Sequence, residues 1–147
     1  MLVKDAMTSK AEWVSPSISV REIAQKMKAK NIGCMPVGEN DRVIGMITDR
    51  DIACRAVANG GDMNKLTARD VMSKGLVYCF DDQDLGAAAR LMNEKQVHHL
   101  PVMNREKRMV GMLALGDIAN KGSKDVLATI TPVVARDAAR NNPAKAP

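Results

Sequence analysis

Aromatic residues are nearly absent from this sequence, which has one Trp, one Tyr and one Phe among 147 residues. Surfaces that bind single-stranded nucleic acid usually combine aromatic with basic side chains. Here the net charge of +5 is spread along the chain, which argues against nucleic acid as a partner and favours small anionic molecules. We expect a hydrophobic core of Ala, Val, Ile, Leu and many of the eleven Met residues.

Cysteine is also scarce, because the chain has only Cys34, Cys54 and Cys79 and no CxxC pair. This odd number argues against a disulfide framework and against a four-ligand zinc site, so we expect no metal. Buried, reduced thiols are the first expectation for all three. A redox switch is the alternative, with Cys34 as its candidate.

Long hydrophobic runs are missing, and no segment reaches the 18 or more apolar residues typical of a membrane span. The segment Met1 to Ala11 carries Lys4, Asp5 and Lys10 where a signal peptide would have its apolar region. We therefore expect a cytoplasmic protein without a membrane partner. The sequence also lacks a Walker loop, a GxGxxG motif and a convincing Ser/His/Asp arrangement. We predict no catalytic residues and no enzymatic activity.

The sequence contains the same pattern twice, at a spacing of 65 residues. Met7, Ala24, Met27, Pro36 and Val37 recur as Met72, Ala89, Met92, Pro101 and Val102, and after a one-residue slip Asp51-Ile52-Ala53 recurs as Asp117-Ile118-Ala119. A repeat of this length indicates a folded unit used twice. We assign residues 1–61 to the first unit, residues 62–122 to the second, and residues 123–147 to a short helix or arm with a disordered end.

Each repeat predicts the order β-α-β-β-α, so the fold class is α/β (α+β). A short strand in residues 13–19 or 78–84 leads to a helix that Ser19 with Glu22, or Asp84, can cap. The expected core faces of these helices are Val20, Ile23, Ala24 and Met27, and Leu85, Ala88, Ala89 and Met92. Two apolar runs around a polar turn then predict a hairpin, followed by second helices over about 49–58 and 116–121.

The segment from Gly45 to Asp51 is the sharpest local signal, because a buried strand passes directly into a helix there. Gly45 lets another group approach the backbone. Thr48 at the N-cap and Asp51 at N3 bring free amides and the positive helix end to one place, which suits a phosphate. Thr48 and Arg50 could then bind phosphate oxygens while Asp51 accepts from two ribose hydroxyls. The alternative is that Thr48 and Asp51 only form a capping box.

Several of these motifs together resemble a CBS-domain pair, also called a Bateman module. They are the tandem β-α-β-β-α units, the segments Ala6-Met7-Thr8 and Val71-Met72-Ser73, the strands Met35-Pro36-Val37 and Leu100-Pro101-Val102, and the Gly-hydrophobic-x-Thr-x-x-Asp motif. The resemblance covers residues 1 to about 122. It is closest to small stand-alone bacterial CBS-pair proteins, whose first unit often reads as Thr48 to Ile52 does here.

The resemblance implies one compact module in which two pseudo-twofold units form clefts for adenine nucleotides. The residues it assigns are Val14, Met35 and Pro36 against the adenine, backbone groups near Ser15 and Cys34 at its edge, and Thr48 and Asp51 at the phosphate and ribose. The ligand would be AMP, ADP, ATP, NAD or an S-adenosyl compound. The resemblance also implies a homodimer through helix faces, for which Ile52, Val57 and Ile118 are the apolar candidates.

The second copy departs from this pattern, because Ala114, Leu115 and Gly116 replace Thr48, Asp49 and Arg50. Asp117 is retained and could still hold a ribose. Losing a charge-assisted phosphate contact costs about 1.5–3 kcal/mol. We therefore expect one competent nucleotide site in each chain.

The leading hypothesis is a regulatory, ligand-sensing module that signals to an unknown downstream protein by a conformational or assembly change. The alternative is a nucleotide-independent interaction or stress-response scaffold. Trp13, Tyr78 and Phe80 border the predicted first strands. We expect them in the core, with stacking on adenine as the alternative.

Overall fold

The structure, a computed structural model, describes residues 1–140 and forms two compact units. The first-repeat unit is Glu12–Leu76, and the second-repeat unit combines Met1–Ala11 with the chain from Val77 onward. These limits differ from the repeat boundaries at residues 61 and 122 expected above. The disordered end expected within residues 123–147 falls in part on residues 141–147, which lie outside the described residues.

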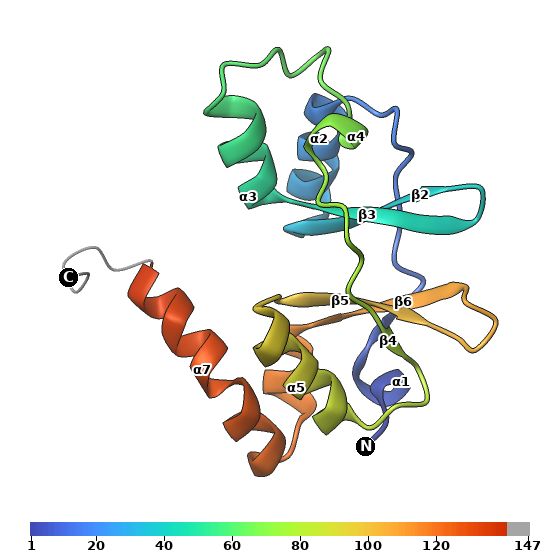
Figure 1. The fold of residues 1–147 in the computed structure, drawn as a ribbon, viewed down its shortest axis with the longest axis vertical. Helices are drawn as coiled ribbons and strands as arrows, with labels where there is room; N and C mark the ends of the chain where they lie inside the picture. The colour runs from blue at the N-terminus through green and yellow to red at the C-terminus, as the bar shows by residue number, and fades with distance from the viewer. Residues whose placement is uncertain (141–147) are drawn as a thin grey trace. The chain divides into compact units, whose positions relative to one another are not determined.

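The first-repeat unit has helices on one face of a two-stranded hairpin (Figure 1). Its elements are α2 (Val20–Lys30), β2 (Cys34–Glu39), β3 (Arg42–Thr48), α3 (Asp49–Asp51), η1 (Ile52–Val57) and α4 (Ala68–Val71). Strands β2 and β3 are antiparallel, with Cys34 opposite Thr48 at the open end and Glu39 opposite Arg42 beside the turn. Its core is the cluster Val14, Val20, Ile23, Met27, Met35, Val37, Ile47, Ala56, Ala68, Val71 and Met72.

The second-repeat unit has the same plan with a fuller sheet, in the order β1-β6-β5-β4. Its elements are α1 (Val3–Ala6), β1 (Thr8–Ser9), β4 (Cys79–Phe80), α5 (Leu85–Lys95), β5 (His99–Met103), β6 (Met109–Ala114), α6 (Leu115–Lys121) and α7 (Lys124–Arg140). In the first-repeat unit the outer strands shrink to single bridges, Val14 with Val37 and Met46 with Ser73. The expected strand over residues 13–19 is therefore only one bridge long.

The short helices α1 and α4, which we call the leader helices, are exchanged between the repeats. Helix α1 opens the first repeat in sequence but packs in the second-repeat unit, where the Val3 amide donates to the Gln83 carbonyl at 2.9 Å. Helix α4 opens the second repeat but packs in the first-repeat unit, where the Ala68 amide donates to the Ile18 carbonyl at 2.9 Å. This exchange is why the compact units divide the chain differently from the repeats.

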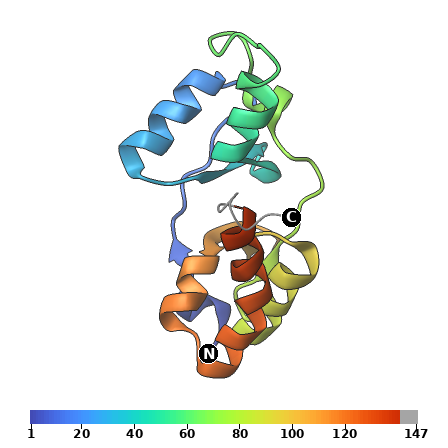
Figure 2. The same ribbon diagram turned by 90° about the vertical axis from the view of Figure 1, so that its left-hand side faces the viewer.

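The equivalent helices α2 and α5 differ in what covers them. Helix α7 lies along α5 and α6 (Figures 1 and 2), and a Cβ at Gly86 would be 3.8 Å from Val126 of α7. All four expected core positions of α5 are buried. On α2, by contrast, Ala24 is exposed. The expectation for Ala24 was wrong because α2 does not pack on a helix equivalent to α7 within its own unit.

Three further expectations need correction. Trp13 and Tyr78 are 38% and 37% exposed, so they are not core residues. Cys79 is buried and Cys34 half-buried, but Cys54 is exposed. Ile118 is fully buried in its own core, whereas Val57 is 60% exposed, so only Val57 of this pair presents an apolar surface.

The second helix of the first repeat is also irregular, because α3 continues as a π-helix from Ile52 to Val57. Within residues 1–140, no helix is both long and apolar enough to cross a membrane.

Candidate functional site

The candidate site is the junction where β3 passes into α3, because Thr48 and Asp51 meet there as the spacing predicts. The Asp51 amide donates to Thr48 Oγ1 at 3.0 Å, and the Thr48 amide donates to Asp51 Oδ2 at 2.9 Å. These two bonds form a capping box. Each residue keeps further capacity, since the Thr48 hydroxyl can still donate and Asp51 Oδ1 takes no part in the cap.

The first-turn amides of α3 are all used by the protein itself. The Asp49 amide donates to the Gly33 carbonyl at 2.9 Å, and the Arg50 amide donates to Asp49 Oδ1 at 2.8 Å. With Asp51 bonded to Thr48, no amide of this turn is left for a phosphate. The expectation of free amides at this helix start was therefore wrong. Binding of an anion would depend on side chains, and Arg50 is exposed.

Cys34 lies across from Thr48 in the β2–β3 hairpin. Burial and, as smaller contributions, the negative charges of Asp51 and Asp49 together raise the pKa of its thiol to about 12. The two carboxylates are therefore close enough to act on Cys34. Because a neutral thiol is a poor nucleophile, this environment argues against the redox-sensitive role considered for Cys34.

The apolar residues expected against the adenine lie in the same unit. Val14 joins β2 through two backbone bonds, from its amide to the Pro36 carbonyl and from the Gly38 amide to its own carbonyl, both at 2.9 Å. Val14 and Met35 belong to the core of this unit, and the Met35 side chain is fully buried. Met35 therefore has a packing role in the core.

Gly45 also has a role within the fold, because a Cβ there would lie 2.8 Å from the Ser73 carbonyl oxygen. The group that approaches this glycine is thus the chain after α4. Gly111 is in the same situation, with the Thr8 carbonyl oxygen 2.6 Å from its ideal Cβ position. Both glycines permit the exchanged segments to pair with the hairpins.

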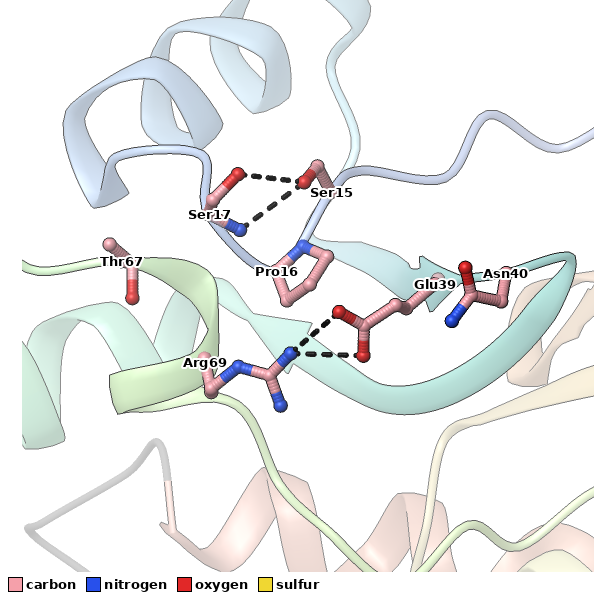
Figure 3. A pocket seen from close by; sticks show the side chains of 8 residues that line it. Ser15, Pro16, Ser17, Glu39, Asn40, Thr67 and Arg69 are labelled. Carbon is pink, nitrogen blue, oxygen red and sulfur yellow. Dashed lines mark hydrogen bonds and ion pairs between the residues drawn. The ribbon is translucent and has the colours of Figure 1, made fainter.

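An open pocket of about 480 Å³ lies at the turn end of the hairpin, opposite the end that carries Thr48 (Figure 3). Its lining is Ser15, Pro16, Ser17, Gly38, Glu39, Asn40, Thr67 and Arg69. Arg69 donates to both oxygens of Glu39 at 3.0 Å, and the hydroxyls of Ser15 and Ser17 are 2.9 Å apart. Ser15 is the one predicted site residue in this pocket.

Sequence reasoning did not identify Arg69 or Thr67 as neighbours of Ser15, since they reach this place only through the exchange of leader helices. The second-repeat unit carries larger side chains at the equivalent positions. There Phe80 replaces Ser15, and Arg105 binds Asp82 at 2.7 Å and stacks 4.1 Å above the Phe80 ring.

The junction of the second-repeat unit keeps half of the cap. The Ala114 amide donates to Asp117 Oδ2 at 2.8 Å, but Ala114 has no hydroxyl and Gly116 has no side chain to replace Arg50. Asp117 is half-buried. It belongs to a different compact unit from the other predicted site residues.

No group of three or more His, Cys, Asp or Glu side chains within residues 1–140 is arranged to hold an ion.

A family model described as "CBS domain" matches residues 3–56 and 68–124. Among curated proteins, the CBS domain-containing protein YhcV of Bacillus subtilis is 41% identical over 117 residues, covering 80% of this chain and 82% of YhcV. Hypoxic response protein 1 of Mycobacterium tuberculosis is 33% identical over 117 residues, covering 79% of this chain and 81% of the relative.

Two solved structures share the fold. The crystal structure of Hypoxic Response Protein I, with two coordinated zinc ions, has a TM-score of 0.75 at 31% identity and covers 84% of this chain and 100% of that one. The CBS domain pair of protein MJ0100, in complex with 5-methylthioadenosine and S-adenosyl-L-methionine, has a TM-score of 0.74 at 27% identity. That match covers 82% of this chain and 98% of the other.

Proposed function

Because the chain belongs to the CBS-domain family and contains two CBS units, we propose that it is a regulatory module that binds an adenine nucleotide. The observation that carries the proposal is the capping box of Thr48 and Asp51, which holds a carboxylate in place and leaves Oδ1 outside the cap. The Asp51 side chain is 15% exposed. A partly desolvated carboxylate accepts hydrogen bonds more strongly than a fully hydrated one.

In the proposed complex the ribose hydroxyls donate to Asp51, and the Thr48 hydroxyl and Arg50 bind phosphate oxygens. The adenine lies against Val14 and Pro36, with its edge toward the backbone near Ser15 and Cys34. Met35 contributes by holding this strand in the core. Asp117 would support at most a weaker second site.

The proposal that the ligand contains adenosine is supported by the MJ0100 complex, whose two ligands both contain this group. AMP, ADP, ATP and NAD share that group, and Arg50 favours those with phosphate. The proposed action is regulatory and not enzymatic, with the protein in the cytoplasm, where it would act on an unknown downstream protein. Occupancy would shift the population of conformations or of a homodimer.

Calorimetric titration with AMP tests this proposal on the whole chain, with Asp51→Asn and Asp117→Asn as a matched pair. Asn keeps an oxygen that can cap the helix but removes the charge. We expect one site per chain. The affinity should fall about 10- to 150-fold in Asp51→Asn, which corresponds to a charge-assisted hydrogen bond of about 1.5–3 kcal/mol. Asp117→Asn should bind AMP as the wild type does.

Equal affinity of the wild type and Asp51→Asn for AMP would refute the role of Asp51 in binding. Two equivalent sites per chain would refute the proposal that only the first-repeat unit binds the nucleotide well. If AMP, ADP, ATP and NAD all fail to bind, the scaffold hypothesis gains instead. That second function is favoured by one observation, namely that the protein itself uses all three first-turn amides of α3.

A further inference from the structure

Arg55 connects the candidate site with the end of leader helix α4. Its Nη1 donates to the carbonyl oxygens of Val71 and Met72, both at 3.3 Å. Its Nε lies 3.8 Å from Asp51 Oδ1, the oxygen that takes no part in the cap. One guanidinium therefore contacts both the proposed ribose acceptor and the carbonyl groups at the end of α4.

The second-repeat unit contains half of this arrangement. Lys121, which is equivalent to Arg55, donates from Nζ to the Ala6 carbonyl at 3.2 Å. Ala6 is equivalent to Val71, so each unit holds the end of its leader helix with a cation from its second helix. Within residues 1–140, however, Lys121 forms no ion pair with Asp117. The link from cation to carboxylate is thus specific to the unit that keeps Thr48 and Arg50.

We propose that Arg55 is a positioning residue that couples nucleotide binding at Asp51 to the chain segment after α4. This inference rests on the proposed function, because it requires a ligand at Asp51. Ribose hydroxyls that donate to Oδ1 compete with Arg55 Nε for this oxygen. The guanidinium then donates more fully to the carbonyls of Val71 and Met72, since those are its other acceptors.

The chain segment after α4, which would respond to nucleotide binding, is hydrogen-bonded to β3. The Ser73 amide donates to the Met46 carbonyl at 2.8 Å, and the Met46 amide donates to the Ser73 carbonyl at 3.2 Å. Stronger binding of Arg55 to the end of α4 stabilises this bridge against local opening. The chain then continues through Leu76 into the other unit, so the bridge is a point from which occupancy can affect the whole molecule.

Amide hydrogen exchange on the whole chain, with and without saturating AMP, tests the coupling. In the wild type we expect AMP to slow exchange of the Ser73 amide about fivefold or more, within the usual range of coupling between sites. Arg55→Met replaces the guanidinium with an apolar side chain. It should bind AMP with nearly wild-type affinity, exchange Ser73 faster without ligand, and show no slowing with AMP.

Lys121→Met is the matched control, because it removes the equivalent contact in the other unit. It should speed exchange of the Met7 amide, which donates to the Val3 carbonyl at 2.9 Å, and leave the AMP response of Ser73 intact. If Arg55→Met binds AMP and still slows Ser73 as the wild type does, the coupling is refuted and the proposed function stands. If AMP, ADP, ATP and NAD all fail to bind the wild type in the titration, the proposed function itself fails. Arg55→Lys provides a milder substitution with the same expected loss of response, should Arg55→Met unfold.

Discussion

The two compact units share one plan but differ where their side chains reach the surface. Both hold a leader helix from the other repeat, both keep a glycine against the exchanged segment, and both use a cation from the second helix to bind the leader carbonyls. At the junction between the hairpin and the second helix, only the first-repeat unit has a hydroxyl at the N-cap (Thr48) and an arginine two residues later (Arg50). Positions that the repeats share therefore build the fold, and positions at which they differ give each junction its own side-chain chemistry.

The two units also differ in whether their first long helix, α2 or α5, is packed against another helix. Helix α5 has small residues at Gly86, Ala88 and Ala89, all buried, and it packs on α7. Helix α2 has Arg21 where α5 has Gly86, and both Arg21 and Ala24 are exposed. The composition of each helix matches its environment, because a long charged side chain at position 86 would occupy the space next to Val126 of α7.

The matched substitutions Ala89→Lys and Ala24→Lys should show the largest difference between the units, which is a difference in the free energy of unfolding. Ala89 is fully buried, so a lysine there must bury a charge without a partner or separate α5 from its neighbours. We expect a loss of about 3 kcal/mol or more in the free energy of unfolding. Ala24→Lys should change it by no more than about 0.5 kcal/mol. Urea unfolding measures both, and similar losses for the two variants would contradict the difference in covering.

Transferring the junction residues of the first-repeat unit into the second-repeat unit should give the second unit a nucleotide site. The triple substitution Ala114→Thr, Leu115→Asp and Gly116→Arg gives the second-repeat unit the side chains of Thr48 to Arg50. We expect this variant to bind AMP at a second site, with the gain of about 10- to 150-fold that a charge-assisted contact provides. The stoichiometry in a calorimetric titration is the readout. A stoichiometry that stays at one would show that the junction residues are not sufficient.

The thiols should give the smallest difference between the units. Burial raises the pKa of both Cys34 and Cys79 to about 12, but Asp51 and Asp49 contribute only at Cys34. At pH 8 about one thiol in ten thousand is ionised at such a pKa. We expect a thiol reagent to label Cys54, which is exposed, well before the other two. Asp51→Asn should speed labelling of Cys34 and leave Cys79 unchanged, and an equal change at both would contradict the carboxylate effect.

The same pKa shifts affect stability at high pH. A raised thiol pKa means that the folded state keeps a proton that the unfolded state loses. Stability is therefore unaffected below the ordinary pKa of 9.0 and falls as the pH rises from there toward about 12. Urea unfolding between these limits measures this effect.

Much of the fold was predictable because it depends on local patterns. The repeat, the hairpins, and the cap of Thr48 with Asp51 follow from spacing along the chain, and the structure contains them. The mixed α/β class is confirmed as well. At the site, the pairing of Cys34 with Thr48 follows from the hairpin register. These features need only residues that are close in sequence or joined by one turn.

Other features could not be predicted because they depend on contacts between distant segments. The exchange of leader helices brings Arg69 beside Glu39 and Val71 beside Arg55, and no periodicity along the chain encodes either contact. The exposure of Ala24 depends on where α7 packs, although its sequence pattern is that of the buried Ala89. The occupied first-turn amides of α3 were missed for a different reason, because a cap pattern does not show that the Asp49 amide donates to the Gly33 carbonyl before β2 or that the Arg50 amide donates to the Asp49 side chain.

The sequence by itself determined the duplicated unit, its element order and the asymmetry between Thr48 to Asp51 and Ala114 to Asp117, because side-chain chemistry and short-range spacing are properties of the chain alone. Only the tertiary structure decided which helices are covered, which repeat holds each leader helix, and which carbonyls Arg55 reaches. Those outcomes follow from packing between segments up to 115 residues apart, as in the contact of Lys121 with Ala6.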